Sequence, residues 1–179
     1  MERLDSRTVL DGAPFEVAEA RFRRADGSEV ERQVAYHPGS VAIVAHDGEA
    51  VYLVRQPREA VGEDGLLEIP AGTMDVEGES ALECARRELS EEVDLRAEQW
   101  TELHTIYPSP GFLSESVTIF LATDLAPEPG DGDDDEQIEI VRLPLTELDS
   151  ALAGIADAKT LVALMLLRDS FVAHEDPGV

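Results

Sequence analysis

One amphipathic helix constrains this chain more than any other stretch of its sequence. Ser80 followed by Glu83 is the pattern of a capping box, so we expect a helix over about residues 81–93. A helix with a single apolar stripe has to bury that stripe against another layer, here a sheet. Cys84 lies off the stripe and is expected to point away from it. Four apolar side chains fall on one narrow face of the helix: Leu82, Ala85, Leu89 and Val93.

Strands and a second helix surround this element in the sequence. Asp-Gly pairs at residues 26–27 and 47–48 predict two hairpin turns. A largely apolar helix is expected over residues 160–171, and the acidic stretch 131–136 is expected to be a flexible loop. This interleaving indicates an α/β fold, with a mixed sheet between helices and an N-terminal β-hairpin in front of it. The expected strands cover residues 15–24, 29–36, 41–45, 50–54, 66–69, 100–107, 116–122 and 138–143.

The charge of the chain restricts its partners. Its 179 residues, the size of one ordinary domain, include 39 acidic and 14 basic ones, for a formal net charge of -25. Such a surface repels nucleic-acid backbones and anionic membranes, so neither is an expected partner. A small anionic substrate would need a bound metal ion or a local cationic patch. Lys159 is the only lysine. An arginine-favouring genome and a halophile-like adaptation to high salt both explain this bias, and both stay open.

No segment points to a membrane or to export. The longest apolar stretch, near residues 161–167, is too short to span a bilayer. The first residues lack the apolar core of a signal peptide. The single cysteine cannot form an intramolecular disulfide, and no Cys/His cluster suggests zinc. We therefore expect a cytoplasmic protein.

Three glutamates give the expected helix its chemistry. Glu88 and Glu92 are four residues apart, so they project side by side at the edge of the apolar stripe, and Glu91 lies within a turn of Glu88. Like charges at this spacing repel each other and destabilise a helix. A divalent cation removes the conflict, and hard oxygen ligands are those that Mg²⁺ or Mn²⁺ prefers. Taken alone, the same pattern is also typical of a solvated helix rich in Glu and Arg, so the flanking residues decide.

The stretch from Gly72 to Leu95 resembles the Nudix box, the loop–helix–loop motif of the Nudix hydrolases. The motif has a glycine, a glutamate and an Arg-Glu-apolar-x-Glu-Glu run, which are matched here by Gly72, Glu79 and residues 87–92. The chain departs from the motif twice: the loop before Glu79 is one residue longer, and Asp94 replaces a glycine at the helix exit. The resemblance implies the Nudix α/β/α sandwich and Mg²⁺-dependent hydrolysis of the pyrophosphate bond of a nucleoside diphosphate derivative.

Flanking segments are similar in particular to the ADP-ribose pyrophosphatase branch of that family. They are residues 54–58, 67–72 and 110–115. The resemblance implies hydrolysis of ADP-ribose to AMP and ribose 5-phosphate. It also implies a homodimer, with residues 1–36 as dimerising strands and residues 37–179 as the Nudix domain. The resemblance further implies that Mg²⁺ (or Mn²⁺) is held by the carbonyl of Ala71 and by Glu79, Glu88, Glu91 and Glu92. It implies that Arg87 fixes the helix. The residues implied to bind the substrate are Arg55, Arg58, Glu68 and Gly72.

Two of the candidate residues have a second explanation. Arg58 suits a phosphate because its guanidinium is a planar, bidentate donor, but a salt bridge at a sheet edge would also account for it. Glu115 follows the loop at residues 108–112, which holds two prolines and a glycine. The resemblance makes Glu115 a general base or a water-orienting group, acting with Glu91 and Glu92. The alternative is an exposed polar residue at the start of a strand.

Other functions remain open at this stage. The chain could be a Nudix hydrolase that acts on another nucleoside diphosphate sugar, a dinucleotide or a nucleoside triphosphate. It could also be a catalytically silent Nudix-fold sensor, or an acidic interaction protein without turnover. The intact set of Glu88, Glu91 and Glu92 argues against a sensor, because ligand binding alone does not need all three carboxylates.

Overall fold

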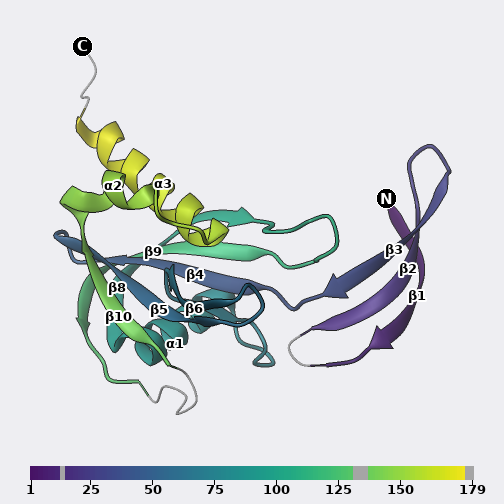
Figure 1. Ribbon diagram of the computed structural model, residues 1–179, viewed down its shortest axis with the longest axis horizontal. Helices are drawn as coiled ribbons and strands as arrows, with labels where there is room; N and C mark the ends of the chain where they lie inside the picture. Colours follow the sequence, from purple (N-terminus) through teal and green to yellow (C-terminus); the bar gives the residue numbers. More distant parts are fainter. Residues whose placement is uncertain (13–14, 131–136, 176–179) are drawn as a thin grey trace.

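The computed structural model of the chain describes residues 1–12, 15–130 and 137–175, which form two separate sheets and their covering helices (Figure 1). The N-terminal sheet lies to one side of a larger body that holds the other strands and the helices. The acidic loop expected at residues 131–136 falls outside the described residues. None of the helices in the described ranges is both long and apolar enough to cross a membrane.

The larger sheet is mixed, as the sequence predicts. Its strands are β4 (Ser40–His46), β5 (Ala50–Arg58), β6 (Glu63–Glu68), β7 (Ala71–Thr73), β8 (Leu95–Ile106), β9 (Val117–Pro127) and β10 (Glu139–Pro144). Within the described part of the chain, the main path runs β10-β5-β4-β9-β8, with β6 paired to β5 and β7 paired to β4. β4 and β9 are parallel, and the other pairs are antiparallel.

Helices cover both faces of this sheet. They are α1 (Ala81–Val93), a short 3₁₀ turn η1 (Leu145–Glu147), α2 (Leu148–Leu152) and α3 (Ala158–Glu175). β4 lies in the middle and is apolar on both sides: Val41 and Ile43 belong to the core against α1, whereas Ala42 and Val44 belong to the core against α3. Because successive side chains of a strand point to opposite faces, such an unbroken apolar run requires a layer on each side. The predicted α/β/α sandwich is confirmed.

Local signals in the sequence place α1 at its predicted residues. The capping box is present, because the hydroxyl of Ser80 accepts from the backbone N–H of Glu83 and the carboxylate of Glu83 accepts from that of Ser80 at 2.8 Å. The helix ends at Asp94, which adopts the left-handed conformation (φ 55°) in place of the usual glycine and donates its N–H to the carbonyl of Ser90. A longer lead-in loop and an aspartate at the exit therefore leave the helix itself unchanged.

The prediction for Cys84 was wrong. Ala85, Leu89 and Val93 are buried as expected, but Cys84 is fully buried with them in the core between α1 and the sheet. The sheet covers a wider strip of the helix than the four predicted apolar positions, and a thiol is small enough to fit at its margin.

The N-terminal sheet contains one strand more than the hairpin expected. β2 (Glu16–Arg23) and β3 (Glu29–Tyr36) form that hairpin, and β1 (Glu2–Leu10) pairs with the outer side of β2. β1 lacks an apolar alternation, since all but one of its residues are exposed. Ion pairs join it to β2 instead, from Arg7 to Glu19 and from Arg21 to Asp5. Such polar pairing leaves no periodic signal in the sequence.

Candidate functional site

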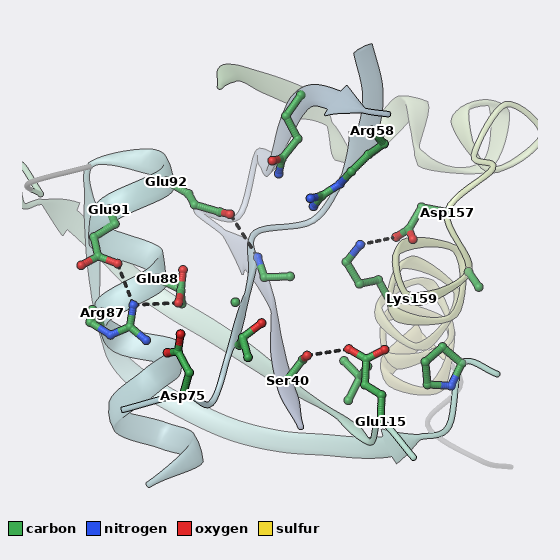
Figure 2. A pocket seen from close by; sticks show the side chains of 17 residues that line it. Ser40, Arg58, Asp75, Arg87, Glu88, Glu91, Glu92, Glu115, Asp157 and Lys159 are labelled. Atoms are coloured by element: carbon green, nitrogen blue, oxygen red, sulfur yellow. Dashed lines mark hydrogen bonds and ion pairs between the residues drawn. The ribbon is translucent and has the colours of Figure 1, made fainter. Parts of the chain in front are cut away.

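A cavity of about 640 Å³ opens where the two helix layers meet the ends of β4, β5, β7 and β9 (Figure 2). Its volume is typical of a site for a nucleotide-sized ligand. The cavity is lined by Ser40, Gln56, Arg58, Ala71, Gly72, Thr73, Asp75, Arg87, Glu88, Glu91, Glu92, Pro108, Glu115, Val117, Asp157, Ala158 and Lys159.

Helix α1 supplies an acidic wall to this cavity. Glu92 is 7% exposed and accepts a hydrogen bond from the backbone N–H of Ala71 at 3.0 Å. Glu88, one turn earlier, lies directly over Gly72, where an added Cβ would be 1.9 Å from the Oε1 atom of Glu88. Position 72 therefore has to lack a side chain for the Glu88 carboxylate to keep this place. The lead-in strand β7 and the helix thus bring backbone and carboxylate oxygens to one wall.

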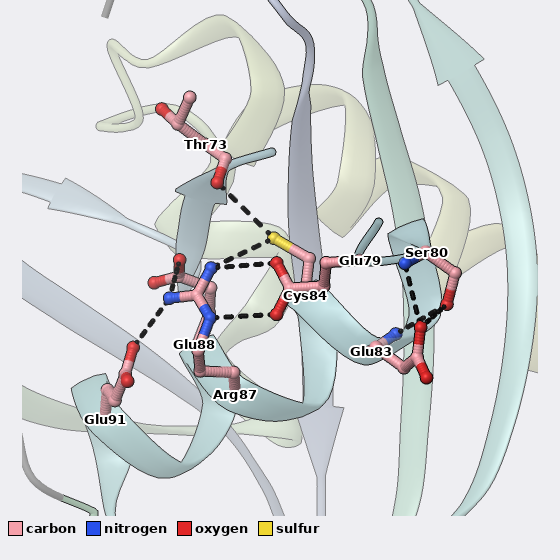
Figure 3. A network of polar contacts seen from close by, with 8 residues as sticks. All are labelled: Thr73, Glu79, Ser80, Glu83, Cys84, Arg87, Glu88 and Glu91. Carbon is pink, nitrogen blue, oxygen red and sulfur yellow. Dashed lines mark hydrogen bonds and ion pairs between the residues drawn. The ribbon is translucent and has the colours of Figure 1, made fainter. Parts of the chain in front are cut away.

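Arg87 connects three glutamates of the box (Figure 3). Its Nε atom lies 3.0 Å from Oε1 of Glu79, and its Nη1 atom lies 2.8 Å from oxygens of both Glu88 and Glu91. These contacts, with the hydrogen bond to Glu79 as the largest cause, raise the pKa of Arg87 above its usual range. The same hydrogen bond lowers the pKa of Glu79. Arg87 therefore stays charged and offsets the repulsion among three carboxylates.

Cys84 lies beside this network but is not suited to act as a nucleophile. Its Sγ atom is 3.6 Å from the carbonyl oxygen of Thr73 and 3.5 Å from Nη2 of Arg87 (Figure 3). Burial raises the pKa of the thiol to about 12. A thiol that stays protonated near neutral pH is a poor nucleophile.

The acidic wall has the donor set of a hard divalent cation. Glu88, Glu91 and Glu92 offer carboxylate oxygens on one side of the cavity, and Gly72 makes room for the Glu88 carboxylate because it has no side chain. Within the described ranges, however, no three His, Cys, Asp or Glu side chains converge closely enough to hold a metal ion. Here Glu88 and Glu91 contact Arg87 instead. The residue types fit Mg²⁺, and binding would require these side chains to turn toward a common point.

A second wall, opposite α1, carries two cations and is organised by a buried glutamate. Arg58 contacts Glu68 through Nε at 2.6 Å and through Nη2 at 3.0 Å. The side chain of Glu68 is 1% exposed, and Lys159 donates to it as well. Burial alone would raise the pKa of Glu68, but the hydrogen bond from Arg58 and the charge of Lys159 outweigh burial and lower it. Glu68 is therefore a buried anion that holds two cations in place.

Glu115 lies just before the start of β9, and its side chain is held by the neighbouring strand β4. The hydroxyl of Ser40, at the start of β4, donates to Oε1 of Glu115 at 2.5 Å (Figure 2). The loop before Glu115 is bound to the end of β3, because the N–H of Ala35 donates to Phe112 and the N–H of Ser114 donates to Ala35. Glu115 thus enters the cavity from a loop whose backbone is bound to β3, while its side chain is held by β4.

The cavity brings together most of the residues that the sequence singled out. Three of them do not line it: Arg55 contacts the carbonyl of Gly65, Glu68 lies beneath Arg58, and Glu79 lies behind Arg87. The predicted residues that do line it are Arg58, Ala71, Gly72, Arg87, Glu88, Glu91, Glu92 and Glu115.

Several lining residues were missed, and only one had a usable signal. That residue is Gln56: it lies two positions before Arg58 on β5, so both side chains point to the same face of the strand. Arg55 points to the other face and does not line the cavity. Asp75 lies in the loop of the box but matches none of its defined positions; Ser40 and Lys159 lie outside every motif, and only tertiary folding places them at the cavity.

Several known proteins are similar to this chain. A family model described as NUDIX domain matches residues 35–165. The chain is 42% identical over 125 residues to the ADP-ribose pyrophosphatase of Mycobacterium tuberculosis, a match that covers 69% of this chain and only 60% of that protein. It is 34% identical over 178 residues to the ADP-ribose pyrophosphatase of Bacillus subtilis, covering 94% and 95% of the two chains. A solved structure described as an ADP compounds hydrolase superposes with a TM-score of 0.83 at 29% identity, covering 97% of this chain and 95% of that one.

Proposed function

The chain belongs to the Nudix hydrolase family and is a pyrophosphatase of that family, and we propose that its substrate is ADP-ribose, which it hydrolyses to AMP and ribose 5-phosphate. The relatives named ADP-ribose pyrophosphatases support the choice of substrate, and one arrangement in the cavity supports hydrolysis of a pyrophosphate bridge. The carboxylates of α1 face Arg58 across a single cavity, and Glu115 enters the same cavity from its anchored loop. A pyrophosphate bridge between the two walls would meet metal ligands, a guanidinium and a candidate base at once.

Proteins of this family typically depend on a divalent metal ion, and we propose Mg²⁺, with Mn²⁺ as a substitute. Glu88, Glu91 and Glu92 would hold the ion together with the carbonyl of Ala71. Glu79, which lies behind Arg87, would be a further ligand, directly or through a water molecule. When bound, such an ion neutralises phosphate charge and makes a coordinated water more acidic. The hard oxygen donors on the α1 wall, with the Glu88 carboxylate placed over the Gly72 backbone, support this assignment.

The other site residues would act on the substrate directly. We propose that Arg58 donates to the phosphates, as its guanidinium lines the cavity while two of its nitrogens are held by Glu68. Glu115 would orient or deprotonate the attacking water, whose in-line attack on one phosphorus needs no covalent enzyme intermediate. The hydrogen bond from Ser40 would keep the Glu115 carboxylate directed into the cavity.

A kinetic comparison of substrates tests the proposal. Full-length protein with Mg²⁺ is given ADP-ribose, ADP-glucose and ATP, and the products are separated chromatographically. We expect kcat/KM for ADP-ribose to exceed the values for the other two by at least about tenfold. The reason is that protein groups that hydrogen-bond to the hydroxyls of the terminal ribose would be left without a partner when an analogue binds. If a triphosphate or a hexose conjugate is clearly the better substrate, ADP-ribose is not the substrate, although the family assignment stands.

We further propose that residues 1–36 join two copies of the chain. The three-stranded sheet stands beside the body (Figure 1), and Val9, Leu10 and Phe15 at one end of it are 48%, 57% and 42% exposed. A second copy would cover these apolar side chains. Sedimentation equilibrium of the full chain is expected to give twice the mass of one chain, and a triple change to Ser at these positions to give mostly single chains. A wild-type protein that sediments as a single chain at micromolar concentration contradicts dimerisation.

A further inference from the structure

Lys159, the only lysine of the chain, lies in the cavity rather than on the outer surface. It is the second residue of α3, and its side chain is 17% exposed. Figure 2 places it beside Arg58, on the side of the cavity opposite Glu88, Glu91 and Glu92. A partly buried ammonium is costly unless its charge is used, so this position calls for a reason.

The contacts of Lys159 leave it with binding capacity. Its Nζ atom donates to Oε2 of Glu68 and lies 3.1 Å from Oδ2 of Asp157. An ammonium group has three hydrogens to donate, and these two carboxylates account for two directions. Glu68 is shared with Arg58, so one buried anion sets the position of two cations at the cavity. A third acceptor can come from a ligand in the cavity.

The start of α3 is held in place without Lys159. The carboxylate of Asp157 caps the helix by accepting from the N–H of Thr160 at 2.9 Å. The buried hydroxyl of Thr160 accepts in turn from the backbone N–H of Ile69 at 2.9 Å, which ties the helix to the segment between β6 and β7. A neutral side chain at position 159 would leave both of these bonds and the contact between Arg58 and Glu68 intact, although Glu68 would lose one of its two cations.

We propose that Lys159 is a substrate-binding residue that donates to a phosphate oxygen, an inference that rests on the proposed function because it needs a substrate with a pyrophosphate bridge. On the α1 wall Arg87 is held by Glu79, Glu88 and Glu91, so the cations of the opposite wall are the ones placed to reach that bridge. The guanidinium of Arg58 is planar and the ammonium of Lys159 is a compact charge, so the two would bind neighbouring phosphate oxygens with different geometries. Glu68 acts through both of them as a positioning residue.

Calorimetric titration of the full chain with inorganic pyrophosphate in magnesium buffer tests this contact without turnover. Lys159→Met keeps the length of the side chain but removes its charge, and we expect pyrophosphate to bind roughly 10–100-fold more weakly, the range typical of a lost hydrogen bond to a charged group. Lys159→Arg should retain most of the affinity. Arg168→Met is the matched control, because it removes a cation from the same helix outside the cavity, where Arg168 pairs with Asp169. It should bind as the wild type does.

The outcomes separate this inference from the substrate proposal. Unchanged pyrophosphate affinity in Lys159→Met, or an equal loss in Arg168→Met, would overturn the phosphate contact even if ADP-ribose is hydrolysed. If the wild type does not hydrolyse ADP-ribose but its pyrophosphate affinity still depends on Lys159, the contact stands and only the substrate is wrong. Should Lys159→Met fail to fold, Lys159→Gln carries the same expectation, and thermal melting of each variant identifies a merely structural loss.

Discussion

Changing Glu92 to Gln is expected to lower the Mg²⁺-dependent kcat/KM by at least about 100-fold while the protein remains folded. Glu92 is 7% exposed and accepts from the N–H of Ala71, a bond that the amide oxygen of glutamine can also accept. The substitution therefore keeps shape and hydrogen bonding but removes one negative charge from the α1 wall. If Glu92 is a metal ligand, as we propose, the remaining carboxylates bind the ion more weakly.

The control for this variant is Glu102→Gln, which removes a carboxylate from the exposed part of β8, away from the cavity. It should leave both activity and Mg²⁺ dependence unchanged. Activity is measured over a range of Mg²⁺ concentrations, since a weakened metal site is partly rescued at high concentration whereas a misfolded one is not. Near wild-type activity of Glu92→Gln at limiting Mg²⁺ would remove Glu92 from the metal site.

Local chemistry explains why α1 and the box around it could be predicted from the sequence. The capping box, the apolar stripe and the spacing of Glu88 and Glu92 all act within a few residues of one another, so tertiary folding could not override them. The same holds for the central strand β4, whose apolar run requires cover on both faces. Where a prediction depended on how far a neighbouring layer extends, as for Cys84, it was wrong.

The parts that could not be predicted depend on contacts between distant segments. Lys159 meets Glu68 across 91 residues, and Ser40 meets Glu115 across 75. Neither Lys159 nor Ser40 belongs to a pattern with a period or a spacing, so no sequence signal places them in the cavity. β1 is similar, because it is joined to β2 by the backbone ladder and by exposed ion pairs rather than by an apolar face. The sequence therefore predicted the carboxylate wall well and the cationic wall only through Arg58.

The Glu115→Gln variant should lose about 100-fold or more in kcat with a much smaller change in KM, the loss typical of removing a general base. The Ser40 hydroxyl donates to Oε1 of Glu115 at 2.5 Å, and a glutamine oxygen at that place can accept the same bond. The side chain thus stays in position, and only its capacity to take a proton is removed.

The hydrogen bond between these residues supplies an internal control for the same prediction. Ser40→Ala leaves the carboxylate of Glu115 but removes its anchor, so it should lower kcat to a lesser extent than Glu115→Gln. Combined with Glu115→Gln, Ser40→Ala should add little further loss, because residues that act through one contact are not additive. Steady-state kinetics of both single variants and the double variant give the coupling. A Glu115→Gln protein in which only KM rises would make Glu115 a binding contact, and fully additive losses would mean that Ser40 acts on catalysis by another route.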